Sequence, residues 1–403
     1  MVASLSPAID SYKNASAFAI VPTRKLALSS LAPSLYQWID SADALDAACK
    51  QVAGANVIAL DTEFFRENTF FPVPALIQFT TGEMAYLVDP LSTPCTEAFR
   101  DLLQNSAIKL LHACSEDLEV FQHWAGVLPA PLVDTQVAQA FLGEIPGMGY
   151  QKLVEHWMGE TLPKEETRSN WLERPLTPSQ CEYAALDVIY LLKVWGFQAE
   201  KLEQLGRRVW LDDECASLIE QAGRSVESDG QWYTRQRQLW RLEPHQLEAY
   251  RLMTIWREGE TRRRDLPRNW LVSDKLLFAV AEKMPKNRYE LAEIEGVKPP
   301  LVKKEGDTLL ALVKQAQHCS NDDLPARWPD PMHPSFKRRF KALKKVVTEK
   351  AAELQVAPEM LLRRRDIEAL VMQQLANQPL TTPGGWRHAY LTQEIHQALE
   401  ESS

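Results

Sequence analysis

The sequence of 403 residues has no long hydrophobic run: no stretch approaches the roughly 18 apolar residues that a membrane-spanning helix needs. The N-terminus also lacks the apolar core of a secretory signal, because Asp10 and Lys13 interrupt the region where it would lie. These absences argue against a membrane protein and predict a cytoplasmic location. Residues 1–32 are rich in Ser, Ala and Pro and lack periodicity, so we predict a mobile leader there.

Cysteine is scarce, and its spacing follows no metal-binding pattern. The six cysteines are far apart and form no Cys-x-x-Cys pair, the spacing typical of zinc sites and redox motifs. We therefore expect structural thiols in a reducing compartment and no zinc centre.

Charge is distributed unevenly along the chain. Residues 1–230 contain 16 Lys and Arg against 31 Asp and Glu, whereas residues 231–403 contain 29 against 23, so the net charges are −15 and +6. An acidic surface repels a nucleic acid unless cations intervene, and a basic surface attracts one. Charge alone leaves two interpretations open: two differently solvated surfaces, or a metal-dependent catalytic module followed by modules that bind nucleic acid.

The first half of the chain has the pattern of an α/β layer. Apolar runs at 57–60, 75–79 and 84–88 are separated by turn residues and predict a strand meander, after which helical patterns alternate with short apolar runs. Thr177, Pro178 and Gln180 supply an N-cap, a proline at the first helical position and a capping-box partner. We predict a helix that begins there and ends near Leu205.

The second half shows helical patterns only. Beyond residue 231 no strand pattern remains, and proline, glycine or asparagine separates the helical segments. We predict helices at 244–260, 273–284, 288–294 and 299–317, and a further helical set after the proline-rich stretch 325–334. This pattern predicts two small all-α modules.

Asp61 and Glu63 are the first candidates for a functional site. They stand two residues apart at the end of the predicted strand 57–60, so both side chains leave the same face of the strand. Two like charges at this distance are unfavourable without a cation, and a divalent ion turns them into a ligand set. The alternative is a solvated strand end with two ordinary acids.

Asp117, Tyr183 and Asp187 are further candidates. Asp117 lies in the first turn of a predicted helix, where the helix dipole alone would stabilise an acid. Tyr183 and Asp187 are four residues apart on the helix that follows Thr177, so they project from one face. A structural hydrogen-bonded pair is the alternative to a site. We expect His112 to be a core histidine and Asp134 to cap the helix that follows it.

The candidate residues lie in sequence motifs that together resemble those of a known family. The sequence reads Ala59-Leu60-Asp61-Thr62-Glu63-Phe64, then His112-Ala113-Cys114-Ser115-Glu116-Asp117, later Arg174-Pro175-Leu176, and finally Glu182-Tyr183-Ala184-Ala185-Leu186-Asp187. Over about residues 34–205 this combination closely resembles the exonuclease domain of bacterial ribonuclease D, in the DEDD superfamily of 3′–5′ exonucleases.

The resemblance implies a fold and a site. The expected fold class is α/β, a ribonuclease-H-like exonuclease domain with a mixed sheet flanked by helices, at residues 33–230 with its trailing helix. By the resemblance, Asp61, Glu63, Asp117 and Asp187 are metal ligands and hold two divalent ions, Mg²⁺ or Mn²⁺. Tyr183 falls where the tyrosine subtype has its phenol, which orients the attacking water and, with a lowered pKa, would accept its proton.

The rear modules resemble the helicase-and-RNase-D C-terminal (HRDC) domain. We expect one such domain at residues 231–318 and a second, HRDC-like one at 327–403. Their functional interpretation is phosphate contact through arginine clusters such as 262–264 and 363–365. Solvated helix faces are the alternative.

The resemblance implies a 3′–5′ exoribonuclease that releases nucleoside 5′-monophosphates by a two-metal-ion mechanism. The expected partners are tRNA precursors and other structured RNA 3′ ends, and we expect a monomer. Two other functions stay open: a DNA 3′ exonuclease, since the phosphodiester is common to both polymers, and a non-catalytic adaptor that binds nucleic acid. A preference for the 2′-hydroxyl separates the first from an RNA enzyme.

Overall fold

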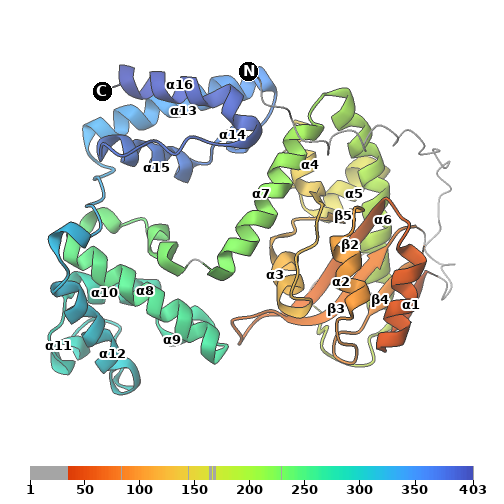
Figure 1. Cartoon of the computed structure of the whole chain (residues 1–403), viewed down its shortest axis with the longest axis horizontal. Coiled ribbons are helices and arrows are strands. Elements are labelled where there is room, and N and C mark those ends of the chain that lie inside the picture. Colours follow the sequence, from red (N-terminus) through yellow and green to blue (C-terminus); the bar gives the residue numbers. More distant parts are fainter. Residues whose placement is uncertain are drawn as a thin grey trace, which may run out of the picture.

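The computed structural model describes residues 35–402 apart from 83, 144, 163–165, 167, 168 and 228. The predicted leader, residues 1–32, lies outside the described residues. A mixed α/β domain is followed by two groups of helices (Figure 1). None of the helices within the described residues combines the length and apolarity that crossing a bilayer requires.

A six-stranded mixed sheet forms the centre of the α/β domain. Its order is β1-β4-β3-β2-β5-β6. β2, β3 and β4 pair in antiparallel fashion, which confirms the predicted meander, and the β1–β4, β2–β5 and β5–β6 pairs are parallel. The strands are β1 (Tyr36–Ile39), β2 (Val57–Phe65), β3 (Val73–Thr80), β4 (Ala85–Val88), β5 (Ile108–Leu111) and β6 (Leu132–Asp134).

β2 extends further than its sequence predicts. The expected strand ended at Leu60, but pairing with β3 continues to Phe65, with a register shift between Glu63 and Phe64. Asp61 lies opposite Gln78 and Glu63 opposite Leu76. Both acids are therefore inside a strand at the centre of the sheet, where neighbouring backbone fixes their positions, and not at a free strand end.

Seven helices accompany the sheet within the described residues. They are α1 (Ala42–Val52), α2 (Glu97–Gln104), α3 (Ser115–Trp124), α4 (Thr135–Phe141), α5 (Tyr150–Met158), α6 (Pro178–Gln204) and α7 (Arg208–Glu227). α6 begins as predicted: Thr177 accepts from the backbone of Gln180, whose side chain accepts from Thr177 in return. This helix crosses the sheet and packs against β1 to β5.

The remaining described helices form two groups without strands. The first group contains α8 (Pro244–Arg264), α9 (Arg268–Leu271), α10 (Asp274–Lys283), α11 (Arg288–Ala292) and α12 (Pro299–Gln317). The second contains α13 (Pro334–Leu354), α14 (Pro358–Leu361), α15 (Arg364–Leu375) and α16 (His388–Glu401). These positions agree with the predicted all-α modules; the exact domain boundaries stay predictions.

The second helical group shares a hydrophobic core with the sheet domain. Trp386 stacks on Trp210 of α7 with ring centroids 4.7 Å apart and meets Phe141 of α4 edge-on at 5.3 Å. Arg207 reaches across and donates to the Leu354 carbonyl at 2.8 Å. Removal of this group would expose aromatic side chains of the sheet domain to water.

The first helical group has its own core and contacts the sheet domain through the loop between β2 and β3. The backbone N–H groups of Phe70 and Phe71 donate to the carboxylate of Asp265, at 2.9 and 3.0 Å. The guanidinium groups of Arg262 and Arg268 lie over the Phe70 ring. A polar and cation–π contact therefore joins the hairpin of β2 and β3 to α8 and α9.

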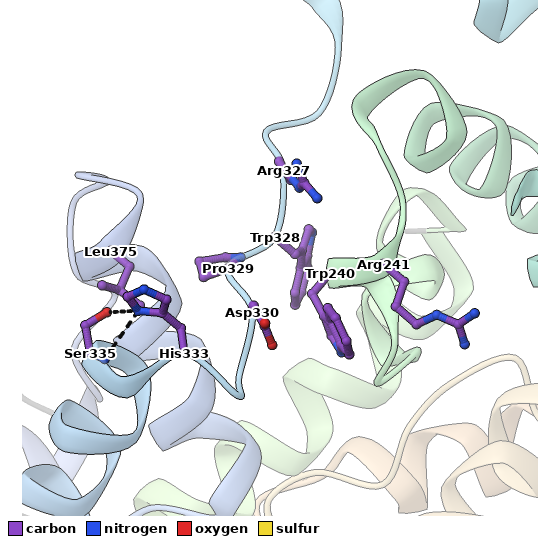
Figure 2. Close-up of a pocket in the computed structure, with 9 residues that line it drawn as sticks. All are labelled: Trp240, Arg241, Arg327, Trp328, Pro329, Asp330, His333, Ser335 and Leu375. Carbon is purple, nitrogen blue, oxygen red and sulfur yellow. Dashed lines mark hydrogen bonds between the residues drawn. The ribbon is translucent and has the colours of Figure 1, made fainter.

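A cavity of about 670 Å³ lies where the two helical groups are connected. Trp240 and Arg241 line it from the first group, and Trp328, His333 and Leu375 from the connecting segment and the second (Figure 2).

An ion pair ties the entry of α6 to the sheet. Arg174 donates to both carboxylate oxygens of Asp89, at 2.7 and 2.9 Å, and to the Ala75 carbonyl on β3. Burial by itself would raise the pKa of Asp89, but the hydrogen bonds from Arg174 and from the Leu91 N–H leave it below its usual value. The charged form of Asp89 therefore stabilises the folded chain.

We predict that Asp89→Asn lowers the free energy of unfolding at pH 7 by about 1.5 to 3 kcal/mol, because the variant loses charge-assisted hydrogen bonds to Arg174. The pKa of Asp89 is lower in the folded chain than in the unfolded chain, where it is about 3.9. The extra stability of the wild type is therefore fully present above about pH 3.9 and is lost as the pH falls through the folded-state pKa of Asp89. Urea denaturation at several pH values measures this difference.

The matched control is Asp101→Asn, an exposed acid on α2. Its effect should stay within about 0.5 kcal/mol at every pH. Equal effects of the two substitutions would contradict the role of the Arg174–Asp89 pair.

Candidate active site

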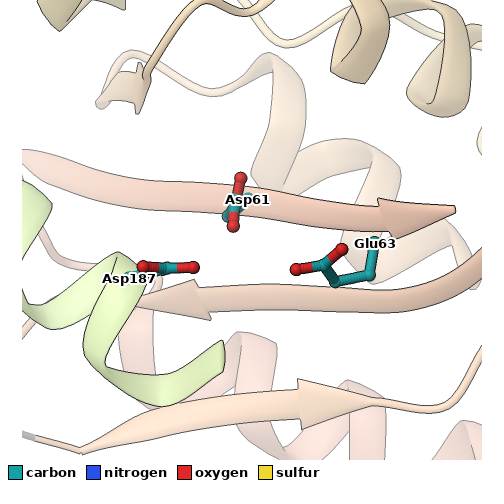
Figure 3. A group of neighbouring side chains, drawn as sticks. All are labelled: Asp61, Glu63 and Asp187. Atoms are coloured by element: carbon teal, nitrogen blue, oxygen red, sulfur yellow. The ribbon is translucent and has the colours of Figure 1, made fainter. Parts of the chain in front are cut away.

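Three carboxylates converge on one face of the sheet (Figure 3). Asp61 and Glu63 come from β2, and Asp187 comes from α6, which covers that face. One oxygen from each lies within 4.8 Å of the others. Strand alternation places the first two side chains together, and the packing of α6 on β2 supplies the third.

Tyr183 joins this group, as its spacing predicts. Its phenol lies beside the Asp187 carboxylate, one turn along α6, and this contact opposes the rise in the pKa of Asp187. Burial first, and then the charges of Asp187, Glu63 and Asp61, raise the pKa of Tyr183 well above its usual value. This direction is opposite to the lowering that a proton-accepting phenol would need, and a cation bound to the three acids would offset the part of the shift that their charges cause.

Asp117 lies outside the group of three. It occupies the first turn of α3, and its carboxylate accepts a hydrogen bond from Thr62 at 2.5 Å. Thr62 leaves β2 on the face opposite Asp61 and Glu63. Asp117 is nevertheless close enough that its charge raises the pKa of both Asp61 and Glu63.

Burial disfavours the charged forms of all four acids, and repulsion from the other acids adds to this effect at Asp61 and Glu63. Burial is the largest cause, and mutual repulsion adds to it, so the pKa values of Asp61 and Glu63 lie well above the ordinary range. Burial raises the pKa of Asp117 to about 7, although the bond from Thr62 opposes this change. Burial likewise raises the pKa of Asp187 to about 8, against the bond from Tyr183.

The donor set fits hard divalent cations. Mg²⁺ and Mn²⁺ prefer carboxylate oxygens, and the three converging acids offer such oxygens at a spacing that one ion can bridge. A bound cation would also remove the repulsion that raises their pKa values. Asp117 supplies a fourth carboxylate beside this set.

Two further residues lie at the site and were not among the predicted site residues, although Gln78 belongs to the sequence pattern that carries the resemblance. Tyr150, at the start of α5, is half-buried, and its hydroxyl donates to the backbone carbonyl of Asp187. Gln78 is fully buried on β3 opposite Asp61, and neither polar atom of its amide has a partner among the described residues. Both depend on contacts between distant parts of the chain, which no local spacing reveals.

The other candidates have structural roles. His112 Nδ1 lies 3.0 Å from the Thr135 hydroxyl, while its buried Nε2 has no hydrogen-bond partner among the described residues. Asp134 caps α4 by accepting from the N–H groups of Gln136 and Val137, which confirms that prediction. It also accepts from the N–H groups of Ala113 and Cys114, and so fixes the turn that leads into α3.

Comparison with protein families matches three parts of the chain. Residues 36–203 match a 3′–5′ exonuclease family, residues 246–313 match the HRDC domain, and residues 334–395 match the C-terminal HRDC domain of ribonuclease D. These ranges fall within the regions for which the motifs predicted the same relationships.

Full-length relatives give the same result. The chain is 39% identical over 371 residues to ribonuclease D of Pseudomonas paraeruginosa, covering 91% of this chain and 98% of the relative. It is 37% identical over 375 residues to ribonuclease D of Escherichia coli, covering 91% and 99%.

The solved structures agree. The crystal structure of E. coli RNase D, described as an exoribonuclease involved in structured RNA processing, matches with a TM-score of 0.83 over 91% of this chain and 99% of that chain, at 37% identity. A protein from Bifidobacterium adolescentis shares the fold with a TM-score of 0.61 at 20% identity. The chain belongs to the bacterial ribonuclease D family of 3′–5′ exoribonucleases, with a divalent-metal-dependent exonuclease domain followed by HRDC domains.

Proposed function

We propose that the chain hydrolyses RNA from its 3′ end and releases one nucleoside 5′-monophosphate per step. The observation that carries this proposal is the convergence of Asp61, Glu63 and Asp187 within 4.8 Å, beside Tyr183, in a chain of this family. Water attacks the terminal phosphorus, and the bond from phosphorus to the 3′-oxygen of the preceding nucleotide breaks. That oxygen takes up a proton and becomes the new 3′-hydroxyl end.

Two divalent cations, Mg²⁺ or Mn²⁺, are the proposed cofactors. When bound, such a pair lowers the pKa of water and stabilises charge on the entering and leaving oxygens of a phosphodiester. Asp61, Glu63 and Asp187 would hold one ion directly. Asp117, which Thr62 orients from the other side of β2, would help to hold the second, directly or through water.

Tyr183 orients the attacking water in this proposal. The phenol hydroxyl acts by hydrogen bonding to that water. It lies beside Asp187, whose backbone carbonyl accepts a hydrogen bond from Tyr150. α6 thus positions a metal ligand and a water-orienting group on adjacent turns.

We further propose tRNA precursors and other structured RNA 3′ ends as substrates. The net charge of +6 on residues 231–403 supports an RNA-binding role for the helical domains, since the sheet domain is acidic.

We further propose that the enzyme is a cytoplasmic monomer. All six cysteines are free, as suits a reducing compartment. Activity on DNA is the alternative, and parallel assays on RNA and DNA of one sequence decide between them.

We expect Asp61→Asn to abolish metal-dependent hydrolysis while the chain still folds. The substitution keeps the size of the side chain but removes one of the charges that hold the cations. Cation catalysis supplies several kcal/mol, so the rate should fall by about 10³ or more. Product release from 3′-labelled RNA measures the rate, calorimetric titration measures metal binding, and circular dichroism checks that the chain folds.

The control for Asp61→Asn is Asp43→Asn, an exposed acid on α1. This variant should keep the wild-type rate and metal affinity. Near-normal hydrolysis by Asp61→Asn would show that the assigned carboxylates are not the active site.

Tyr183→Phe should retain metal binding and lose most of the rate. Only the hydroxyl is removed, so the cost should be about 10² to 10⁴, the range for a group that positions or transfers a proton. Single-turnover rates at saturating RNA measure the chemical step. The control is Tyr86→Phe, which removes a phenol hydroxyl that donates to Gln51 away from the site. Equal rates for the wild type and Tyr183→Phe would refute the water-orienting role.

A further inference from the structure

A second cavity, of about 390 Å³, lies in the first helical domain. Its walls come from the segment that precedes α8, from α8 and α9, and from the start of α10. Most of its charged lining residues are arginines. The lining includes Trp232, Arg235, Arg237, Tyr250, Arg257 and Arg268.

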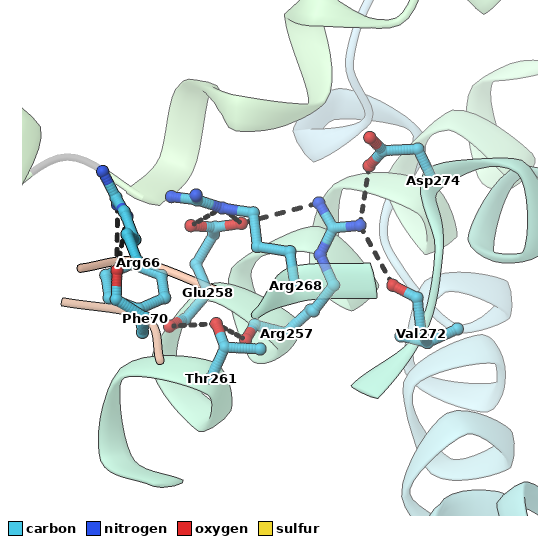
Figure 4. A network of polar contacts seen from close by, with 8 residues as sticks. All are labelled: Arg66, Phe70, Arg257, Glu258, Thr261, Arg268, Val272 and Asp274. Carbon is cyan, nitrogen blue, oxygen red and sulfur yellow. Dashed lines mark hydrogen bonds and ion pairs between the residues drawn. The ribbon is translucent and has the colours of Figure 1, made fainter. Parts of the chain in front are cut away.

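Two of the lining arginines, Arg257 and Arg268, take part in a network of polar contacts (Figure 4). Arg257 is 2% exposed, and its guanidinium lies 2.7 Å from the Asp274 carboxylate and donates to the Val272 carbonyl. Arg268 donates from Nε to both oxygens of the fully buried Glu258, at 2.8 and 2.9 Å. These carboxylates hold the two guanidinium groups in place and compensate their charges.

The other two arginines lack such compensation. Arg235 and Arg237 are exposed, and neither has a carboxylate within ion-pair distance in the part of the chain that the structure describes. The guanidinium of Arg235 lies 3.5 Å from the centre of the Trp232 ring, which Arg268 also approaches, at 4.2 Å. The cavity therefore has two more positive charges than its acids balance.

The guanidinium of Arg235 lies among like charges. Partial burial is the first cause that lowers its pKa, the charges of Arg268 and of Arg365 from the second helical domain add to it, and the charges of Glu258 and Asp274 oppose it. An anion bound at Arg235 would relieve the repulsion between these guanidinium groups.

We propose that this cavity binds a backbone phosphate of the RNA substrate, with Arg235 and Arg237 as the contacting groups. The proposal rests on the proposed function, which supplies RNA as the polyanion. Guanidinium groups bind phosphate oxygens through two parallel N–H bonds, and arginine is suited to this contact. Trp232 holds Arg235 in position by stacking.

The location of the cavity favours RNA over a free anion. Arg268 lies over the Phe70 ring as well as the Trp232 ring, so the wall of the cavity adjoins the loop between β2 and β3. β2 is the strand that carries Asp61 and Glu63. An RNA strand that binds at the cavity therefore lies next to the junction between the first helical domain and the catalytic domain.

The test compares RNA binding by the full chain and by Arg235→Gln/Arg237→Gln. Fluorescence anisotropy of a labelled single-stranded RNA is recorded over a salt series, with EDTA present so that metal-dependent cleavage does not occur. We expect the variant to raise Kd about tenfold at low salt. The plot of log affinity against log salt should become shallower by about 0.7 for each phosphate that the variant no longer neutralises.

Two variants serve as controls. Lys303→Gln/Lys304→Gln removes the same charge from exposed positions on α12, in the same domain but outside the cavity, and should leave Kd and slope unchanged. Arg235→Lys/Arg237→Lys keeps the charge but loses the forked donors, so it should keep most of the slope and lose part of the affinity. Equal effects of the two glutamine pairs would overturn the proposal, because the effect would then reflect net charge alone.

A calorimetric titration with inorganic phosphate tests the other source of the same chemistry. If phosphate binds and the cavity variant abolishes that binding without changing the RNA slope, a free anion is the occupant and the proposal is wrong. Failure of the proposed function is separate: it would appear as wild-type protein that does not hydrolyse RNA with Mg²⁺ or Mn²⁺, whatever the binding data show.

Discussion

Repulsion among buried carboxylates is the constraint on which the rest of this structure depends. Asp61, Glu63 and Asp187 share a small volume, and burial makes each of their charges more costly. Left alone, such a cluster would separate or hold protons at neutral pH. The surrounding fold prevents separation, because two of the acids lie inside a central strand and the third lies on a well-packed helix. A cation bound by these acids, as proposed, would offset the free-energy cost of charging them, which the fold imposes before the ion binds.

α6 fixes the positions of Tyr183 and Asp187 relative to the acids on β2. A capping box fixes its first turn, and Arg174 anchors the segment before it to Asp89 and to the β3 backbone. Tyr183 and Asp187 follow on successive turns, so any movement of the helix start would move both relative to Asp61. The length of α6 across five strands makes such movement costly, since much of the sheet core would have to repack.

The sequence predicted the parts of the site that depend on local spacing. Strand alternation placed Asp61 with Glu63, helical spacing placed Tyr183 with Asp187, and the capping residues located the start of α6. Their convergence required the resemblance, because no spacing relates residue 61 to residue 187. The contact of Thr62 with Asp117, the unpartnered amide of Gln78 and the core shared by Trp210 and Trp386 were not predicted, since each depends on tertiary packing.

The hairpin of β2 and β3 connects the carboxylates of the sheet domain with the arginine-lined cavity of the first helical domain. β2 carries Asp61 and Glu63, and the loop that follows β2 contacts the helical domain that contains Arg235 and Arg237. Asp265 is the C-cap residue of α8, in the left-handed backbone conformation, and its carboxylate accepts hydrogen bonds from the backbone N–H groups of Phe70 and Phe71. The guanidinium of Arg268 lies over the Phe70 ring. Because backbone hydrogen bonds fix this contact, the first helical domain is held in register with the catalytic strand. If the helical domain binds RNA as proposed, that RNA is held at a fixed place relative to the carboxylates.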